Sequence, residues 1–277
     1  MFFCKKLKKY LAGGIFMACC AFAFAIYQIP DDKFHIYFLD IGQGDSILIK
    51  TPENHQILID GGPKNYVLEE LADIMPFFDR EFDFVILTHP HADHVDGLVE
   101  VLKRYKVNGV LLTGVNFFDN TYNEFLKEIQ FLKIPVFIAE KNTDFIFGNV
   151  FVDILFPLTS LAGVNFDNLN NSSVGACIVY KNKKILTLGD LERDAENALL
   201  KTFLPNNVDI YKASHHGSKT ASSFPFLQKI LPKNTVIQVG KDNKFKHPHA
   251  ETIRNFYRAD IEKIYRTDAD GMIEFVF

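Results

Sequence analysis

Apolar runs alternate with turn-forming residues along most of the chain after residue 33. Short runs that are nearly continuous in Ile, Val, Leu and Phe are typical of strands buried on both faces. Between them lie segments with the spacing of an amphipathic helix, such as residues 95–106 with Leu98, Val101 and Leu102 on one side. The pattern predicts strands at 34–40, 45–50, 56–60, 83–88, 108–112, 135–138, 144–147, 150–156, 174–180, 183–189, 208–213, 234–239, 262–266 and 272–276. It predicts helices at 65–75, 95–106, 121–133, 191–202, 222–231 and 249–259.

The order of these elements predicts an α/β fold. Early strands joined by tight turns are followed by alternating strands and helices, and the same order returns in the second half. A sheet buries its apolar faces most simply by packing against a second sheet, with helices covering the outer faces. We therefore expect one sandwich domain over residues 31–277, with the loops that carry chemistry gathered at one edge.

Residues 1–30 differ from the rest of the chain. Four lysines precede an uncharged apolar run over residues 10–29. A basic start, an apolar stretch and the small residues Ala23 and Ala25 describe a cleavable signal peptide, whereas ~20 apolar residues also suffice to span a bilayer. We expect a hydrophobic helix that anchors the chain in the cell membrane with the domain outside, and we keep a secreted, cleaved protein as the alternative.

Cysteine usage indicates a core without disulfides. Three of the four cysteines lie in the leader, so the domain keeps only Cys177, inside the apolar strand predicted at 174–180. A lone thiol cannot form an internal bridge. We interpret it as a small buried side chain rather than a nucleophile.

Charge is distributed unevenly, although the whole chain carries only −4. Residues 31–200 carry a net −12, and residues 201–258 carry +7. Carboxylates attract cations and lysines attract anions, so this asymmetry suits an anionic substrate that meets a metal ion. An ordinary solvated basic face is the alternative. The lysines around the second histidine cluster are Lys212, Lys219, Lys241, Lys244 and Lys246.

The densest group of candidate ligands lies directly after the apolar run Phe84–Leu87. Three histidines and one aspartate occupy six positions there: His89, His91, Asp93 and His94. Imidazole and carboxylate are preferred donors for divalent cations such as Zn²⁺. A single histidine would be explained most simply as a packed or surface residue, but four candidate ligands at the end of a strand predict a metal site.

Two later strands also end in candidate ligands. Asp190 follows the apolar run 184–189, and it is either a ligand between two ions or the N-cap of the next helix. His215 and His216 follow the strand predicted at 208–213. Because consecutive side chains point in different directions, we expect these two histidines to have different roles.

Several short motifs stand in a fixed order along residues 34–277. They are Leu39-Asp40-Ile41-Gly42-Gln43-Gly44-Asp45-Ser46, Leu58-Ile59-Asp60-Gly61-Gly62, the His89 to His94 segment, Asn171-Ser172-Ser173-Val174, Gly189-Asp190, His215-His216-Gly217-Ser218 and His247-Pro248. This set resembles the metallo-β-lactamase superfamily, and within it the extracytoplasmic nuclease-like domain of the ComEC competence proteins. The resemblance implies an αββα sandwich with a hydrolytic centre of one or two divalent ions.

The resemblance also implies a ligand set. The implied metal ligands are His89 and His91 for one ion, Asp93 and His94 for a second, Asp190 as a bridge, and His215 or His216 to complete the second ion. Asp60 would orient the metal-binding segment from behind. Many superfamily enzymes place another histidine before the bridging aspartate, but here no histidine lies between His94 and His215. The nearest substitute is residues 170–173, and an Asn oxygen suits manganese better than zinc, so we expect Zn or Mn.

The expected activity is metal-dependent hydrolysis of an anionic phosphodiester outside the cell, with DNA as the substrate implied by the resemblance. Metal ions activate a water molecule for attack on phosphorus, so no Ser or Cys nucleophile is required. The expected catalytic residues are Asp93, His216 and His247, of which the histidines bind the phosphate or protonate the leaving oxygen. The expected substrate-binding residues are Asn171, Ser218, Lys219, Lys244 and Lys246. The sequence indicates no protein partner.

Two alternatives remain from the sequence alone. The missing histidine is typical of a degenerate envelope module that binds metal without catalysis. The segment from His89 to His94 also fits a small-molecule hydrolase of the lactonase or β-lactamase type. The basic stretch 201–258 favours an anionic substrate over a neutral one.

Overall fold

The computed structural model describes residues 2–27, 31–76 and 78–277, with only the backbone for 2–8 and 23–27. By its contacts the chain divides into two units, Met1–Asp32 and Lys33–Phe277. In the first unit, α1 extends over Phe2–Tyr27.

Among the described residues, no helix combines the length and apolar character that crossing a bilayer requires. The expectation of an apolar anchor or signal peptide over residues 10–29 therefore receives no support from the structure, because a bilayer span needs ~20 consecutive apolar residues. Residues 28 and 29 of that stretch lie outside the described part of the chain.

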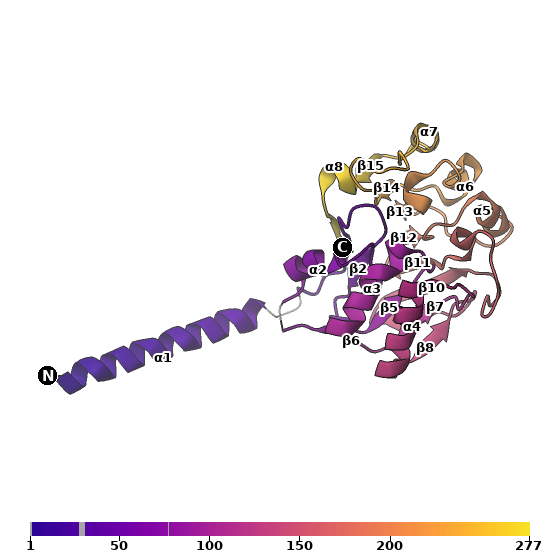
Figure 1. Cartoon of the computed structure of the whole chain (residues 1–277). Coiled ribbons are helices and arrows are strands. Elements are labelled where there is room, and N and C mark those ends of the chain that lie inside the picture. The colour runs from indigo at the N-terminus through magenta and orange to yellow at the C-terminus, as the bar shows by residue number, and fades with distance from the viewer. Residues whose placement is uncertain (1, 28–30, 77) are drawn as a thin grey trace. The chain divides into compact units, whose positions relative to one another are not determined.

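The second unit contains two large sheets and a short strand pair (Figure 1). The first sheet has the order β16 (Ile273–Val276), β1 (His35–Phe38), β2 (Ile47–Lys50), β3 (Gln56–Ile59), β5 (Phe84–Ile86), β7 (Val110–Leu112) and β8 (Val136–Ile138). The second has the order β15 (Lys263–Arg266), β14 (Asn234–Ile237), β13 (Ile210–Lys212), β12 (Lys183–Thr187), β11 (Gly175–Tyr180), β10 (Val150–Phe156) and β9 (Phe145–Phe147). The pair consists of β4 (Glu81–Phe82) and β6 (Lys106–Val107).

Helices cover the outer face of each sheet, so the expected αββα layering is confirmed (Figure 1). On the first sheet lie α2 (Val67–Ile74), α3 (Ala92–Arg104) and α4 (Asn120–Leu132). On the second lie α5 (Arg193–Leu199), α6 (Phe224–Ile230) and α7 (Ala250–Arg258). The shorter elements are the 3₁₀ turns η1 (Leu169–Ser172) and η2 (Ser214–Gly217) and the helix α8 (Thr267–Asp270).

Successive side chains of a strand point alternately to the helices and to the other sheet. Both sides are apolar, which explains why the strand sequences are continuous apolar runs. In β3, Leu58 packs with the helices of the first sheet, whereas Ile57 and Ile59 point toward the second sheet. Ile185 and Ile210 meet them from β12 and β13 in the same central cluster. Both faces of each sheet are therefore buried, and a strand with no polar face is what this burial requires.

The topology brings the ends of several strands to one edge. In the first sheet, β3, β5, β7 and β8 are parallel, and β1 runs in the same direction because both β1 and β3 pair antiparallel with β2. In the second sheet, β12, β13, β14 and β15 are parallel. Ligand-binding loops of such sheets lie at the carboxyl ends of their strands.

The main difference from the expected elements concerns the start of α3. The helix begins at Ala92, not at residue 95, and its N-cap residue is His91. Asp93 and His94 therefore lie in the first helical turn instead of a loop. A carboxylate in the first turn of a helix is favoured by the helix dipole, which explains why Asp93 is compatible with an earlier start.

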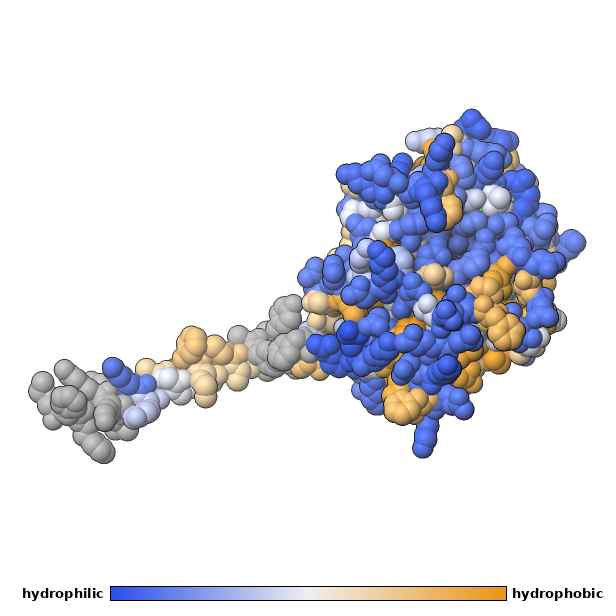
Figure 2. Space-filling model, viewed as in Figure 1, coloured by the Kyte–Doolittle hydropathy of each residue, from blue (hydrophilic) through white to orange (hydrophobic). Residues whose placement is uncertain are grey.

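The surface of the domain also differs between its halves. In the view of Figure 2, the surface over α5, α6 and α7 is mostly hydrophilic, whereas apolar residues gather toward α4 and β8. Exposed apolar residues on or beside those two elements are Phe131, Leu132, Val136 and Phe137. Of these helices, α6 and α7 belong to the basic stretch 201–258.

Two glycines set the distance between α3 and the turn after β3. Gly97 N donates to Gly62 O at 2.9 Å, and Gly61 N donates to His94 O at 2.8 Å. A Cβ on Gly97 would overlap the carbonyl oxygen of Gly61, and a Cβ on Gly61 would overlap the amide nitrogen of Leu98. This close approach fixes the helix that carries His94.

We expect Gly97→Ala to lower the free energy of unfolding by about 3 kcal/mol, because the backbone must move to admit the methyl group. The gain in helix propensity, ~1 kcal/mol, does not offset this strain. Urea unfolding measures the change. Lys103→Ala, on an exposed position of the same helix, serves as the control and should change stability by less than ~1 kcal/mol. An alanine variant at 97 as stable as the unmodified protein would contradict the packing argument.

Candidate metal centre

Five segments from both halves of the chain meet at the edge described above. Asp45 follows β1, Asp60 follows β3, and the segment from Thr88 to His94 follows β5. Asp190 follows β12, and His216 follows β13. The candidate ligands are therefore close in space because parallel strands end together, although they lie far apart in the sequence.

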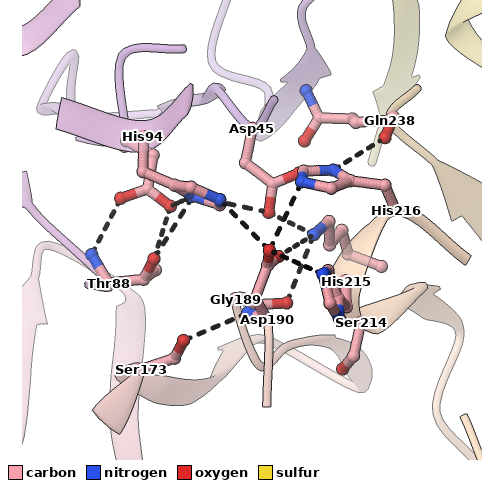
Figure 3. A network of polar contacts seen from close by, with 12 residues as sticks. Asp45, Thr88, His94, Ser173, Gly189, Asp190, Ser214, His215, His216 and Gln238 are labelled. Atoms are coloured by element: carbon pink, nitrogen blue, oxygen red, sulfur yellow. Dashed lines mark hydrogen bonds and ion pairs between the residues drawn. The ribbon is translucent and has the colours of Figure 1, made fainter. Parts of the chain in front are cut away.

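Asp93, His94, Asp190 and His216 form the most compact group. Their ligand atoms all lie within 4.8 Å of one another. Asp190 Oδ2 lies 3.4 Å from His94 Nε2 and 3.4 Å from His216 Nε2 (Figure 3). Asp93 Oδ2 also lies 3.4 Å from His216 Nε2. The Asp93 side chain is about one-third exposed, at 32%, while the other three are buried, so the group is accessible from the side of Asp93.

Asp60 holds His94 from behind. Asp60 Oδ2 lies 2.8 Å from His94 Nδ1, which leaves Nε2 facing Asp190. Asp60 in turn accepts hydrogen bonds from Thr88 N at 2.8 Å and Thr88 Oγ1 at 2.7 Å (Figure 3). This is the position that the sequence analysis expects for Asp60. Such an acceptor fixes the tautomer and the ring orientation of a ligating histidine.

His216 is held in the same manner. The residues that hold it were not expected from the sequence to do so. Its Nδ1 lies 3.1 Å from Asp45 Oδ1 and 3.0 Å from Gln238 O (Figure 3). Asp45 also accepts from the ammonium of Lys212. Asp45 belongs to a motif recognised in the sequence, but the sequence does not reveal that its loop reaches the second histidine cluster.

The expectation that Lys212 belongs to an exposed basic patch is wrong. Lys212 is fully buried and pairs with Asp45. It ends β13, where the strand lies between two layers, so its side chain cannot reach solvent.

Unsatisfied buried atoms show that the group fits a divalent metal ion. His94 Nε2, His216 Nε2 and Asp190 Oδ1 are buried and make no hydrogen bond. Buried polar atoms are nearly always paired, so the two orphaned imidazole nitrogens, each 3.4 Å from Asp190 Oδ2, indicate a missing partner. Two imidazole nitrogens and two carboxylates form a donor set that suits Zn²⁺ or Mn²⁺.

The charges of the group are strongly coupled. Burial lowers the pKa of His94, but the facing carboxylates of Asp190 and Asp60 outweigh it and raise the pKa well above the usual range. For His216, burial acts in the same way and is outweighed by Asp190 and Asp45. Burial raises the pKa of Asp190, but the two histidines lower it well below its usual value. A divalent ion must therefore displace protons from these imidazoles when it binds.

His89 and His91 lie beside the group but not within it. Their rings are joined by a hydrogen bond of 3.0 Å between His89 Nε2 and His91 Nδ1. His89 Nδ1 lies 3.2 Å from Ser173 Oγ, and burial lowers the pKa of His89 well below its usual value. Among the described residues, neither histidine belongs to a cluster of three or more His, Cys, Asp and Glu ligands. A first site at these two histidines would need further donors.

His215 and its neighbours occupy the side of the group opposite the metal-binding segment. Its Nδ1 lies 3.2 Å from Glu192 Oε1, and its Nε2 lies 3.9 Å from Asp190 Oδ2. His215 and His216 both have a positive φ, of 52° and 53°, which is uncommon outside glycine and is associated with functional sites. This backbone directs the two rings to different partners, so the expected division of roles has a structural basis.

Asn170, rather than Asn171, faces the site. Asn170 Nδ2 lies 3.4 Å from His215 Nε2, and its buried Oδ1 makes no hydrogen bond. Asn171 was expected to bind substrate, but its Oδ1 accepts from Glu192 N at 2.9 Å and so holds the turn after Asp190. Successive side chains of the 3₁₀ turn η1 point in different directions, so the two asparagines have different partners.

The remaining expected substrate residues divide into exposed and buried ones. Lys219, Lys244 and Lys246 are exposed. Ser218 is buried, and its Oγ lies 2.9 Å from Thr220 Oγ1 in the turn after the two histidines.

His247 lies next to the histidine pair. Its ring centroid is 5.5 Å from that of His215 and 6.3 Å from that of His216. Its Nδ1 is buried without a hydrogen-bond partner. Burial, together with the neighbouring imidazoles of His216 and His215, lowers the pKa of His247 to about 4. The imidazole is therefore neutral near pH 7, which favours the expected role in binding the phosphate over the expected role in protonating the leaving oxygen.

Comparison with known proteins connects this geometry to a family. The model of the metallo-β-lactamase superfamily matches residues 39–241. Among solved structures, the metallo-β-lactamase fold protein YhfI from Bacillus subtilis superposes with a TM-score of 0.58, at 11% identity over 87% of this chain and 100% of that chain.

The competence proteins to which this chain is similar are much longer than it. ComE operon protein 3 of Bacillus subtilis is 28% identical over 96% of this chain and 36% of its own length. Competence protein ComA of Neisseria gonorrhoeae is 27% identical over 89% of this chain and 33% of its own length. A hydroxyacylglutathione hydrolase of Serratia proteamaculans is 27% identical over 69% of this chain and 68% of its own length. The chain thus spans about a third of the length of the two competence proteins. The family match over most of the domain and these relatives show that the chain belongs to the metallo-β-lactamase superfamily, among proteins similar to ComEC.

Proposed function

We propose that the chain is a divalent-metal-dependent phosphodiesterase that cleaves nucleic acid. The observation that carries the proposal is the group Asp93, His94, Asp190 and His216, in which the orphaned Nε2 atoms of both histidines face Asp190 Oδ2. Membership of a superfamily of metal-dependent hydrolases supports a catalytic use of this group.

Each residue of the group has a defined task in this proposal. A bound divalent ion supplies Lewis acidity and activates water. His94 and His216 hold it through Nε2, because their Nδ1 atoms are engaged by Asp60 and Asp45. Asp190 adds a buried carboxylate. Because the Asp93 side chain is partly exposed, the substrate can reach the centre from that side.

The neutral imidazole of His247 acts by hydrogen bonding in this proposal. Its low pKa makes it a poor store of a proton near pH 7. Its buried, unpaired Nδ1 accepts or donates one hydrogen bond according to its tautomer. A non-bridging phosphate oxygen or the leaving group is a suitable partner at this position.

Charge supports a phosphodiester polymer as the substrate. Lys244 and Lys246 lie just before His247 in the sequence, and Lys219 lies just after His215 and His216. All three are exposed, whereas the metal ligands come mainly from the acidic stretch 31–200. The name of the relative ComA refers to competence, a process of DNA, and this favours nucleic acid over other phosphodiesters.

We retain an extracytoplasmic location as part of the proposal. Its support is the similarity to competence proteins such as ComA, which suggests a place in the cell envelope. Fractionation of expressing cells tests it, and protein found only in the cytosol would contradict it.

A thioester hydrolase is a second candidate because the hydroxyacylglutathione hydrolase match covers two-thirds of both proteins. The full chain, stripped of metal and reloaded with Mn²⁺, Zn²⁺ or Mg²⁺, should be assayed on single- and double-stranded DNA, on bis-p-nitrophenyl phosphate and on a glutathione thioester. We expect hydrolysis of the phosphodiesters. Cleavage of the thioester alone would favour the second candidate, and metal binding without any turnover would favour a binding module.

The ligand assignment predicts the effect of Asp190→Asn. The substitution preserves shape but removes a charge that faces both histidines, so we expect metal affinity and phosphodiester turnover to fall at least ~100-fold. Chelator competition and the bis-p-nitrophenyl phosphate assay measure these quantities. Asp194→Asn, at an exposed position in α5, is the matched control and should leave both unchanged.

Metal should also stabilise the unmodified protein but not the Asp190 variant. A ligand at 100 times its dissociation constant adds about 2.7 kcal/mol to the unfolding free energy. Thermal unfolding with and without Mn²⁺ measures this. An equal stabilisation of both proteins would place the metal elsewhere.

The exposed lysines predict salt-dependent binding. For single-stranded DNA the slope of log K against log salt is about −0.7 per neutralised phosphate, so three lysines should give about −2. Lys244→Ala/Lys246→Ala should flatten the slope and raise KM for long DNA, while turnover of bis-p-nitrophenyl phosphate stays the same. Lys229→Ala/Lys233→Ala removes the same charge from exposed positions elsewhere in the basic stretch and should do neither. A slope near zero in the unmodified protein would contradict a polymeric substrate.

A further inference from the structure

A buried ion pair lies directly beneath the metal centre. The ammonium of Lys212 donates to Asp45 Oδ2 and, at 3.3 Å, to Gly189 O. Lys212 is 0% and Asp45 2% exposed. Taking two such charges out of water costs free energy that packed apolar side chains of similar volume would not. A pair of this kind indicates a role other than holding the fold together.

Asp45 contacts three members of the metal centre. Its carboxylate Oδ1 lies 3.1 Å from His216 Nδ1, and its Oδ2 lies 3.9 Å from His94 Nδ1. Its backbone N–H donates to Asp93 O at 3.1 Å. This approach requires Gly44, because a Cβ there would overlap the carbonyl oxygen of Asp93. The loop after β1 is therefore built against the centre.

Lys212 contacts the fourth member. Its Nζ lies 3.8 Å from Asp190 Oδ1, while Asp190 Oδ2 faces His94 and His216. The two oxygens of Asp190 thus face different cations, one the ammonium and the other the imidazoles. Asp45 lies closer to the ammonium than Asp190 does, so Asp45 draws the ammonium away from Asp190.

We propose that Asp45 and Lys212 are positioning residues that set the metal affinity of the centre. Asp45 fixes His216 with Nε2 toward Asp190, and it keeps the Lys212 ammonium from pairing with the Asp190 carboxylate. This inference rests on the proposed function only in that it requires the metal centre, and it is independent of the substrate.

The two roles of Asp45 predict an unusual pattern among variants. In Asp45→Asn, His216 loses the carboxylate of its ion pair and keeps only Gln238 O at Nδ1, and the ammonium of Lys212 is released to pair with Asp190. Loss of an orienting partner alone typically weakens metal binding 10–100-fold, so we expect a loss of at least ~100-fold when the ammonium also competes. In Asp45→Asn/Lys212→Met the competing ammonium is gone. We therefore expect the second substitution to restore affinity at least ~5-fold relative to Asp45→Asn, still ~10-fold below the unmodified chain.

The measurement is the dissociation constant for Mn²⁺ or Zn²⁺ by chelator competition on the full chain, with thermal unfolding of the metal-free proteins alongside. Lys183→Met is the matched control, because Lys183 pairs with Asp209 at 2.9 Å in the same sheet away from the centre. It should leave the affinity unchanged. A merely structural pair would lose stability in each variant but would not show tighter metal binding after the second substitution.

Other outcomes also test the proposal, or the metal centre that it requires. Equal affinity of Asp45→Asn and the unmodified chain overturns it, and so does a double variant that binds no better than Asp45→Asn. If Asp45→Asn does not fold, the double variant decides: binding about tenfold weaker than the unmodified chain supports the proposal, and equal binding overturns it. A double variant that also fails to fold makes the pair structural and overturns it. Absence of metal binding in the unmodified chain contradicts the metal centre itself.

Discussion

The shared carboxylate of Asp190 is the interaction on which the arrangement of the site depends. It faces His94, carried by the first half of the chain, and His216, carried by the second, at 3.4 Å each. A strand end from the second sheet thereby joins two histidines that differ by more than a hundred positions in sequence. Because loops at the carboxyl ends of parallel strands meet at one edge, this contact needs no long insertion and is set by topology.

The centre also shows how the negative charge of the buried Asp190 is balanced in the absence of metal. The pKa values of His94 and His216 are raised by the carboxylates around them, so protonated imidazoles balance the charge of Asp190. A divalent ion then replaces protons rather than filling an uncompensated anionic cavity. The third cation, Lys212, does not exchange in this way, because it is fixed beneath the centre by Asp45.

The sequence predicted the layers, nearly all the long strands and the segments that meet at the site, because apolar runs and strand ends are local signals. It did not predict the short pair β4 and β6, which are two residues each and show no periodicity. Within the site, it could not separate Asn170 from Asn171 or recognise Lys212 as buried. These depend on the register of a 3₁₀ turn and on a contact between Asp45 and Lys212, 167 positions apart, which no local pattern encodes.

The burial of Lys212 changes how the basic stretch 201–258 should be understood. One of its lysines neutralises an aspartate inside the centre, while Lys219, Lys244 and Lys246 remain at the surface near the same histidines. The lysines of this segment therefore have two roles, and whether a lysine is buried or exposed determines which role it has. The buried ammonium of Lys212 holds the carboxylate of Asp45 beneath the centre. The exposed lysines at the surface attract an anion. Net charge over the segment cannot distinguish the two, and only the side-chain environment of each lysine assigns its part.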